Sequence, residues 1–360
     1  MNTYYKKVML GAILMVSISL FSQETFTKKV EKAFEMNNTG ELHIDNKYGN
    51  VNVTGWNKNK IEIIVEIKVT NKKTENAKSL LDRIETNFRT ASNFVSVASE
   101  ISDKDTSFFS RYFNKVNPFE FDKGNIEINC TVNLPINAEI EVINKFGDVV
   151  IGNWTGKLKA NLEHGDLWIN QSIVNANIDM KFGKLRTKSM TYGTLNLKNG
   201  SADIDVCQDL VLKTSGSNIE INKVDKLKLI SSKDEVAIEQ VGSIDGDIKF
   251  SDVQINQLDK NINLTMKVVD FKVLKINQPD ALVNINQESS DISINITGLS
   301  FKFDATLEEG VLRLPKSFNN VNSDVIDLSK RIRKVSANYG KSKSGTFTFT
   351  GNKGIIALKE

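Results

Sequence analysis

Asn144-Lys-Phe-Gly-Asp-Val-Val-Ile-Gly-Asn-Trp154 matches the earlier segment Asn46-Lys-Tyr-Gly-Asn-Val-Asn-Val-Thr-Gly-Trp56 almost position by position. Both segments read Asn, Lys, an aromatic residue, Gly, Asn or Asp and then Val, and both end in Trp. A glycine, a polar residue and an aliphatic residue in succession are typical of a tight turn that enters a β-strand. The match therefore indicates a repeated unit of one turn and one strand.

The later copy begins a series of similar turns. Gly147, Gly165 and Gly183 follow one another at equal steps along the chain. Looser copies of the turn begin at Tyr192, Gly216, Asp234, Gly246, Ser290 and Gly310. No helical periodicity lies between the copies, so each step fits one turn of a β-solenoid. We predict that Gly49, Gly147, Gly165 and Gly183 lie at its corners, where glycine can adopt positive φ.

Apolar and polar residues alternate through most of the chain, as in Ile61–Thr70, Ile126–Val132 and Thr346–Thr350. This period of two is typical of half-buried strands. The predicted fold class is therefore all-β, and the predicted architecture is a single-stranded β-solenoid resembling a right-handed β-helix. An antiparallel β-sandwich remains the alternative, because it also gives short strands at regular spacing.

One segment, residues 73–90, breaks the alternation. Its apolar residues with helical spacing are Ala77, Leu80, Leu81, Ile84 and Phe88. We predict an amphipathic helix of about four turns that caps the N-terminal end of the solenoid. The hairpin-like segment Gly345–Leu358 is the predicted cap at the other end. The predicted organisation is a signal peptide (1–22), an N-terminal β region (23–135) that holds the helix and a loop (102–125), and a repetitive β-solenoid (136–360).

Aromatic residues gather in the loop of residues 102–125, although the chain as a whole is only 8% aromatic. The candidate binding residues of this loop are Phe108, Phe109, Arg111, Tyr112, Phe113, Phe119 and Phe121. Exposed aromatic rings often mark interaction sites, and Arg can add charge-assisted hydrogen bonds. The loop is therefore either a binding surface for sugar rings or a protein partner, or a satellite cluster folded back on the sheet.

The first 22 residues predict export. Lys6 and Lys7 precede the uncharged, mostly apolar stretch Val8–Phe21, a pattern typical of a cleaved secretory signal peptide, with a short N-terminal membrane anchor as the alternative. No later stretch approaches 18 apolar residues, so no transmembrane helix is expected in the mature chain. The predicted location is the periplasm or the cell surface of a bacterium. Cys130 and Cys207 lie in strand patterns, which favours two buried thiols over a disulfide.

The composition excludes several classes of protein. Lys and Arg number 47 and Asp and Glu 44, a near-balance that argues against a nucleic-acid binder. Only 2 His are present, and no zinc, calcium-loop or nucleophile-elbow motif occurs. His164 is interpreted as a turn residue, and the turn carboxylates and the basic run Lys330–Lys334 are interpreted as solvated surface. We therefore predict no catalytic residue, no cofactor and no metal site. The turn carboxylates are Asp148, Asp166, Asp247 and Asp291.

Two blocks, Gly40–Trp56 and Ile126–Trp154, resemble an adhesin-like family of exported bacterial envelope proteins. The resemblance rests on the glycine turns and on Pro135 between two strands, and it covers most of the mature chain. The aromatic loop and the looser spacing after Leu195 depart from the family pattern. The resemblance implies a right-handed β-solenoid without established catalytic residues, and for some members it implies genes beside extracytoplasmic sigma factors.

The predicted function is that of a non-catalytic, exported, adhesin-like scaffold. Its expected partner is a polymer or protein at the cell envelope, that is, an unknown envelope protein or a glycan. One alternative is a sensor associated with envelope stress or a sigma factor. A second alternative is a carbohydrate-active enzyme on a β-helix, which would need convergent carboxylates or a basic residue in a cleft.

Overall fold

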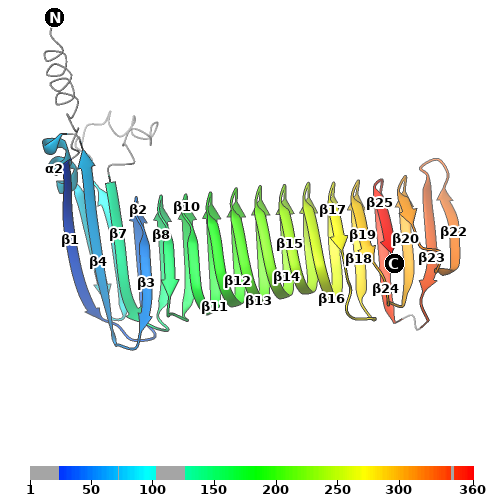
Figure 1. Ribbon diagram of the computed structural model, residues 1–360, viewed down its shortest axis with the longest axis horizontal. Coiled ribbons are helices and arrows are strands. Elements are labelled where there is room, and N and C mark those ends of the chain that lie inside the picture. The colour runs from blue at the N-terminus through cyan, green and yellow to red at the C-terminus, as the bar shows by residue number, and fades with distance from the viewer. Residues whose placement is uncertain (1–23, 72, 103–125, 342–343) are drawn as a thin grey trace, which may run out of the picture.

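The computed structural model describes residues 24–71, 73–102, 126–341 and 344–360. Within these ranges the chain is almost entirely β, and its strands, the first of which is β1 (Glu24–Glu35) and the last β25 (Ile355–Lys359), form one long open sheet. The strands lie side by side along one long axis, and the short helix α2 (Thr74–Asp82) lies at the β1 end (Figure 1). The predicted signal peptide and the seven candidate residues of the aromatic loop lie outside the described residues.

Strands that pair in parallel form the middle of the molecule. They are β8 (Glu139–Lys145), β9 (Val149–Gly152), β10 (Lys157–Glu163), β11 (Leu167–Lys181), β12 (Lys184–Lys198), β13 (Ser201–Ser215), β14 (Asn218–Ser232), β15 (Glu235–Lys249) and β16 (Asp252–Lys267). From β10 to β16 each strand pairs with the next one along the chain. Leu195 lies between its register partners Ile178 and Leu212. The number of residues along the chain from one register partner to the next is smaller by one here than between Leu158 and Ala176. Equivalent aliphatic residues therefore stack into buried rows.

The two copies of the repeated segment, residues 46–56 and 144–154, lie next to each other in the sheet. The N-terminal strands are β2 (Glu41–Lys47), β3 (Val51–Trp56), β4 (Lys60–Asn71), β5 (Ile84–Ala91), β6 (Phe94–Ile101) and β7 (Ile126–Pro135). In parallel register, β2 pairs with β8 and β3 with β9, so that Asn46 lies opposite Asn144 and Val51 opposite Val149. Between the two copies in the chain, β4 pairs antiparallel with β7 and with the earlier strand β1, and β5 pairs antiparallel with β6. Strands β6 and β7 also pair in parallel with β2 and β3. The sequence match is therefore a match between neighbouring strands.

Helix α2 is half as long as the sequence predicts. It ends at Asp82, and residues 84–91 form β5, which pairs with β6 through a tight turn at Ser92, where φ is 46°. The prediction of a helix over 73–90 is wrong there because Ile84 and Phe88 fit both helical spacing and strand alternation, and the β-branched residues between and after them favour the strand. The helix packs against β1 and β4 with Ala77 buried. No helix among the described residues has the length and apolar character needed to span a bilayer.

The C-terminal end differs from the predicted hairpin cap. Its strands are β17 (Asp270–Val273), β18 (Leu282–Glu288), β19 (Asp291–Asn295), β20 (Phe301–Glu308), β21 (Val311–Arg313), β22 (Asn319–Asp327), β23 (Ile332–Tyr339), β24 (Gly345–Asn352) and β25. Strand β24 pairs in parallel with both β18 and β20, and β25 pairs in parallel with both β19 and β21. The last strands are thus inserted into the sheet, and the antiparallel strands β23 and β22 form the outer end beyond β20 (Figure 1).

Aromatic packing explains the insertion. Phe347 and Phe349 of β24 are both buried, and the ring of Phe347 stacks on Phe301 with centroids 3.9 Å apart. An outermost strand would leave one side of these rings without packing partners, whereas an inserted strand buries them on both sides.

The two cysteines are separate, buried thiols, as the sequence favours. Cys130 lies in β7 and Cys207 in β13. Burial raises the pKa of each thiol to about 12, and the charges of Asp209 and Asp225 add to the effect at Cys207. At neutral pH both thiols are therefore protonated and poorly reactive.

Candidate binding face

Buried asparagines build the corner between the paired repeats. The side-chain amide of Asn144 donates to the carbonyl oxygens of Gly147 at 2.8 Å and Gly49 at 3.1 Å. The amide of Asn46 donates to the Gly49 carbonyl at 3.2 Å and to the side-chain oxygen of Asn144 at 3.2 Å. Backbone carbonyls at a buried turn need donors, and the repeated Asn supplies them. This explains why Asn stands three residues before Gly in both copies.

Glycine is required at these corners by close stacking. The left-handed conformation belongs to the residue before each glycine, with φ of 60° at Phe146, 58° at His164 and 56° at Phe182. The expected positive φ at the glycines themselves is therefore wrong. A Cβ on Gly165 would instead lie 1.9 Å from the carbonyl oxygen of Gly147 in the preceding corner. The same contact would be 2.0 Å at Gly147 and at Gly183, so the backbones approach too closely for any side chain.

The residues before the glycines form a stack of rings. Its members, called the aromatic stack below, are Tyr48, Phe146, His164 and Phe182. Successive ring centroids are 5.5, 5.1 and 4.7 Å apart, and the interplanar angles are 8°, 6° and 6°. The left-handed backbone places these side chains at one corner, where Tyr48 packs partly against the core and Phe182 is 48% exposed. The sequence carries a signal for this stack, an aromatic residue or His before each turn glycine, but the prediction concerned only the glycines.

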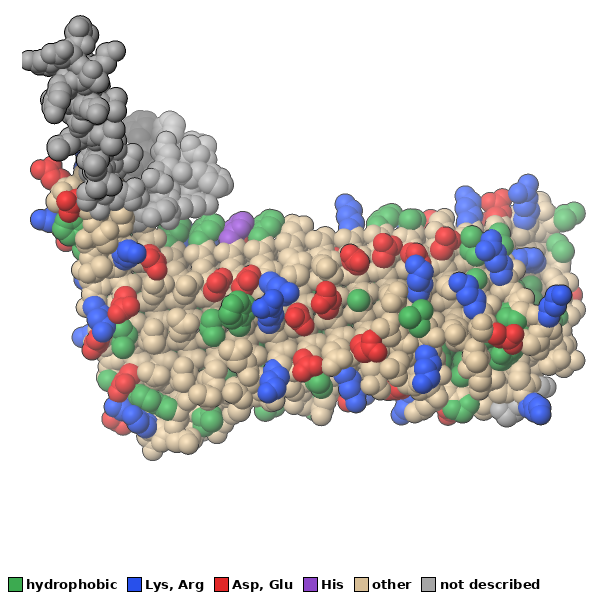
Figure 2. Space-filling view, viewed as in Figure 1, with side chains coloured by type: hydrophobic (Ala, Val, Ile, Leu, Met, Phe, Trp, Pro, Cys, Tyr) green, Lys and Arg blue, Asp and Glu red, His purple; other side chains and the backbone are tan. Residues whose placement is uncertain are grey.

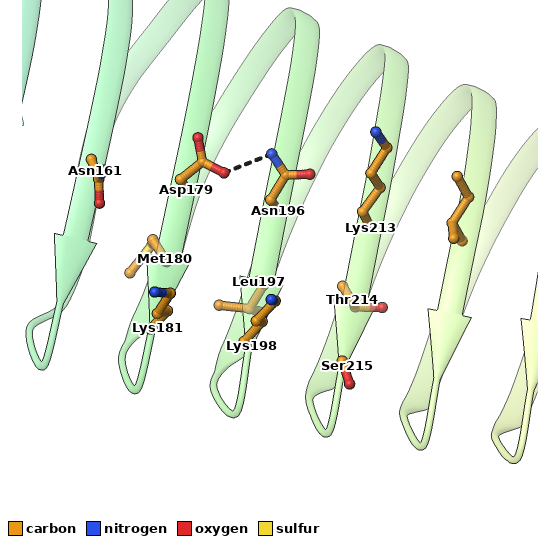
Figure 3. A pocket seen from close by; sticks show the side chains of 11 residues that line it. Asn161, Asp179, Met180, Lys181, Asn196, Leu197, Lys198, Lys213, Thr214 and Ser215 are labelled. Carbon is orange, nitrogen blue, oxygen red and sulfur yellow. Dashed lines mark hydrogen bonds between the residues drawn. The ribbon is translucent and has the colours of Figure 1, made fainter.

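Beside this corner lies a shallow hollow of about 510 Å³, called the lysine groove below (Figure 3). Its lining residues are Asn161, Asp179, Met180, Lys181, Asn196, Leu197, Lys198, Lys213, Thr214, Ser215 and Ile230. Lys181, Lys198 and Lys213 come from the ends of three successive strands, β11, β12 and β13. Lys181 and Lys198 are register partners on neighbouring strands, and all three lysines are exposed.

Charges in the lysine groove are unbalanced. Lys145 pairs with Glu163 at 3.1 Å in the same row of side chains, and its hydrogen bond lowers the pKa of the Glu163 carboxyl. Within the described ranges, neither Lys181, Lys198 nor Lys213 has a carboxylate within 4.0 Å. Lys181 and Lys198 lie opposite each other on adjacent strands and repel, although Glu163 on the other side of Lys181 offsets part of this repulsion. On the face of the molecule drawn in Figure 2, acidic and basic side chains are scattered.

Two of the turn carboxylates have a structural role. The Oδ1 atom of Asp148 accepts a hydrogen bond from the backbone amide of Asp166 at 2.9 Å. Asp166 in turn accepts one from the amide of Lys184 at 2.8 Å. Asp247 lies inside β15, so it is not part of this row, whereas Asp291 begins β19. The basic run Lys330–Lys334 lies at the turn between β22 and β23, far from the lysine groove (Figure 1).

No protein-family model matches this chain, and no curated protein matches it. Similar solved structures carry provisional names as adhesins or cell adhesion proteins. One, a provisionally named cell adhesion protein from Clostridium sporogenes, is 12% identical and has a TM-score of 0.22, with 93% of this chain and 99% of that chain covered. A provisionally named adhesin from Parabacteroides merdae is 11% identical with a TM-score of 0.34, covering 74% of this chain and 92% of that chain. A provisionally named lipid binding protein from Parabacteroides distasonis is 12% identical with a TM-score of 0.33, and the match covers 74% of this chain and 92% of that chain.

Proposed function

We propose that the chain is a β-solenoid that serves as an exported, non-catalytic binding scaffold. The solenoid interpretation is supported by the parallel pairing of successive strands at a nearly constant displacement along the chain. An antiparallel sandwich would pair neighbouring strands in opposite directions. Export rests on the signal-like residues 1–22. N-terminal sequencing of the envelope-associated protein should find a start near Gln23, and an intact Met1 would contradict cleavage.

The bound partner, in this proposal, is an extended anionic glycan that lies along the lysine groove. The observation that carries it is the juxtaposition of Lys181 and Lys198 on neighbouring strands, with Lys213 on the next strand and, among the described residues, no ion pair within 4.0 Å to any of the three. Glu163, the register partner of Lys181 on β10, is ion-paired with Lys145 instead. Anionic groups placed between these ammonium groups would replace repulsion by charge-assisted hydrogen bonds. A polymer with repeated charges matches a surface whose charges come from repeated strands.

Aromatic faces next to the groove fit the same class of partner. Phe182 of the aromatic stack directly follows Lys181 in the chain and is half exposed. Sugar rings present apolar faces that can pack on aromatic rings at little cost in conformational entropy. The lysines would therefore select the charge of the polymer, and the rings would add contact area.

The test compares two probes and two variants. Dextran sulfate should bind the protein, the uncharged dextran of equal length should bind at least about tenfold more weakly, and salt should weaken the binding of dextran sulfate. A triple variant, Lys181→Gln, Lys198→Gln and Lys213→Gln, should bind dextran sulfate at least about tenfold more weakly than wild type, because three exposed cations of the groove are lost.

The control variant, Lys188→Gln, Lys223→Gln and Lys226→Gln, removes the same charge from positions near the middle of β12 and β14. It should retain most of the affinity. Equal losses in the two triple variants would mean that dextran sulfate responds only to net charge. Unchanged binding by the groove variant would contradict the proposed site.

A further inference from the structure

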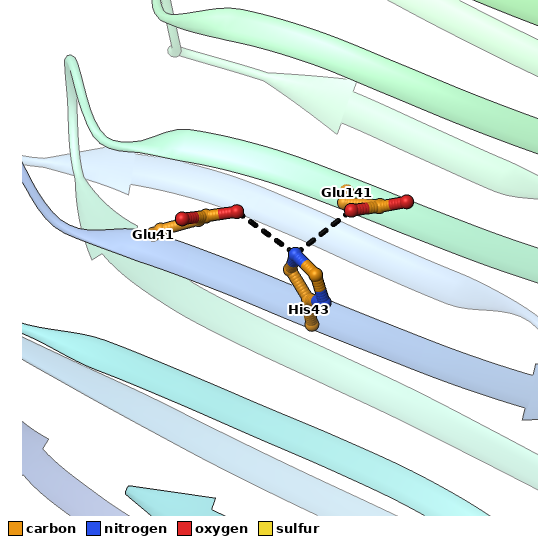
Figure 4. A group of neighbouring side chains, drawn as sticks. All are labelled: Glu41, His43 and Glu141. Atoms are coloured by element: carbon orange, nitrogen blue, oxygen red, sulfur yellow. Dashed lines mark hydrogen bonds and ion pairs between the residues drawn. The ribbon is translucent and has the colours of Figure 1, made fainter. Parts of the chain in front are cut away.

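A second cluster of polar side chains lies near the N-terminal end, away from the lysine groove. Glu41 and His43 project from β2, and Glu141 lies opposite His43 on the neighbouring strand β8 (Figure 4). The Nε2 atom of His43 is 2.8 Å from Oε1 of Glu41 and 2.8 Å from Oε2 of Glu141. One ligand atom from each residue lies within 4.8 Å of the others.

Hydrogen bonding alone does not satisfy this arrangement. A single ring nitrogen carries at most one hydrogen, so Nε2 can donate one short, linear hydrogen bond. Two carboxylate oxygens nevertheless approach the same nitrogen at the same distance. A cation that all three atoms coordinate would satisfy both carboxylates and the ring nitrogen together.

Neighbouring side chains hold the cluster in position. Lys159 on β10 approaches the other oxygen of Glu141, Oε1, at 2.6 Å, which leaves Oε2 directed at His43. The ring of Phe94 lies edge-on to the imidazole with centroids 5.1 Å apart. Partners of this kind orient ligands in metal sites. His43 and Glu141 also line a hollow of about 250 Å³, whose lining includes Arg89, so solvent can reach the cluster.

We propose that Glu41, His43 and Glu141 bind a divalent transition-metal ion, with Zn²⁺ as the best match. One imidazole nitrogen and two carboxylate oxygens form a set of donors that Zn²⁺ takes, whereas Mg²⁺ and Ca²⁺ prefer oxygen ligands alone. Two carboxylates balance the charge of the ion, and three protein ligands leave room for water.

The experiment is a calorimetric titration of the untagged mature chain with Zn²⁺, and with Mg²⁺ and Ca²⁺ in parallel. We expect one Zn²⁺ per chain and at least about tenfold weaker binding of the other two ions. His43→Gln and Glu141→Gln should each weaken Zn²⁺ binding at least about tenfold, because each removes a ligand. Both side chains are part-exposed, so the metal-free melting temperature should change little.

Matched controls change the same residue types outside the three proposed ligands. His164→Gln changes the other of the two histidines in the sequence, and Glu139→Gln changes a glutamate two residues before Glu141 on the same strand. Both controls should bind Zn²⁺ as wild type does. The proposal is wrong if wild type binds no Zn²⁺, or if the control variants lose as much affinity as His43→Gln. Should His43→Gln unfold, Glu41→Gln provides the same comparison with the histidine intact.

Discussion

Gly165→Ala should destabilise the protein by about 3 kcal/mol or more, at or above the upper range of an ordinary overpacked site. The new Cβ would lie 1.9 Å from the carbonyl oxygen of Gly147, which belongs to the backbone of the preceding corner. A flexible side chain could move away from such a contact, but a backbone carbonyl inside a stack of paired strands cannot do so without separating β9 from β11.

Gly152→Ala is the matched control for this prediction. Gly152 also lies in the stacked region, at the end of β9, but a Cβ there would meet no atom within 4 Å. We expect its effect to stay within about 0.5 kcal/mol, as for most substitutions in open space. The midpoint of urea denaturation, followed by circular dichroism, measures both variants. Equal midpoints for the two variants would contradict the close stacking of the glycine corners.

Asp234→Ala should cost about 3 kcal/mol, because it leaves several buried donors without an acceptor. Asp234 takes the place of glycine at a later corner and is only 4% exposed. Its Oδ1 atom accepts from the backbone amide of Ser217 at 2.8 Å, and Oδ2 accepts from the amide of Ser232 at 2.9 Å. The hydroxyl groups of Thr214 and Ser231 also donate to Oδ2, at 2.6 and 2.7 Å.

The matched control is Asp252→Ala. Asp252 is an exposed aspartate at the start of the next strand, β16, so its removal should change stability by less than about 0.5 kcal/mol. The measurement is the melting temperature of each variant compared with that of wild type, which should fall clearly only for Asp234→Ala. Similar melting temperatures would mean that the hydrogen bonds to Asp234 do not hold this corner together.

The sequence was most informative where structure is local or repeated. Alternation identified the strands, and the equal steps from Gly147 to Gly183 indicated which residues are neighbours. Local periodicity was ambiguous at Ile84 and Phe88, because their spacing fits both a helix and a strand. Only the pairing of β5 with β6 shows that these residues form a strand. The insertion of β24 between β18 and β20 could not be predicted, because the order of strands in space differs from their order in the chain.

Both candidate sites depend on register, which the composition does not specify. Lys181 and Lys198 become neighbours only because the register between β11 and β12 shifts by one residue between Ile169 and Ser172. His43 and Glu141 become neighbours only because the two copies of the repeated segment pair with each other. From the sequence alone His43 is a strand residue, and no metal site is predicted. The three proposed ligands come together only through the pairing of β2 with β8.

Distances between spin labels test the stacking of successive strands most directly. Lys157, Asn175, Tyr192, Asp209 and Lys226 form one row of register partners, and the row continues through Ser243 to Asn261. Labels on cysteines introduced at Lys157 and Lys226 span four strand spacings, and those at Lys157 and Asn261 span six. The buried native thiols, with pKa values of about 12, should not take up label.

Double electron–electron resonance should give about 19 Å for the first pair and about 29 Å for the second, within the reach of the label side chains, because neighbouring strands lie about 4.8 Å apart. The increase of about 10 Å between the two pairs is the decisive quantity, since it depends only on two further strands being added to the stack. A second distance equal to or shorter than the first would contradict the stacked arrangement and, with it, the lysine groove.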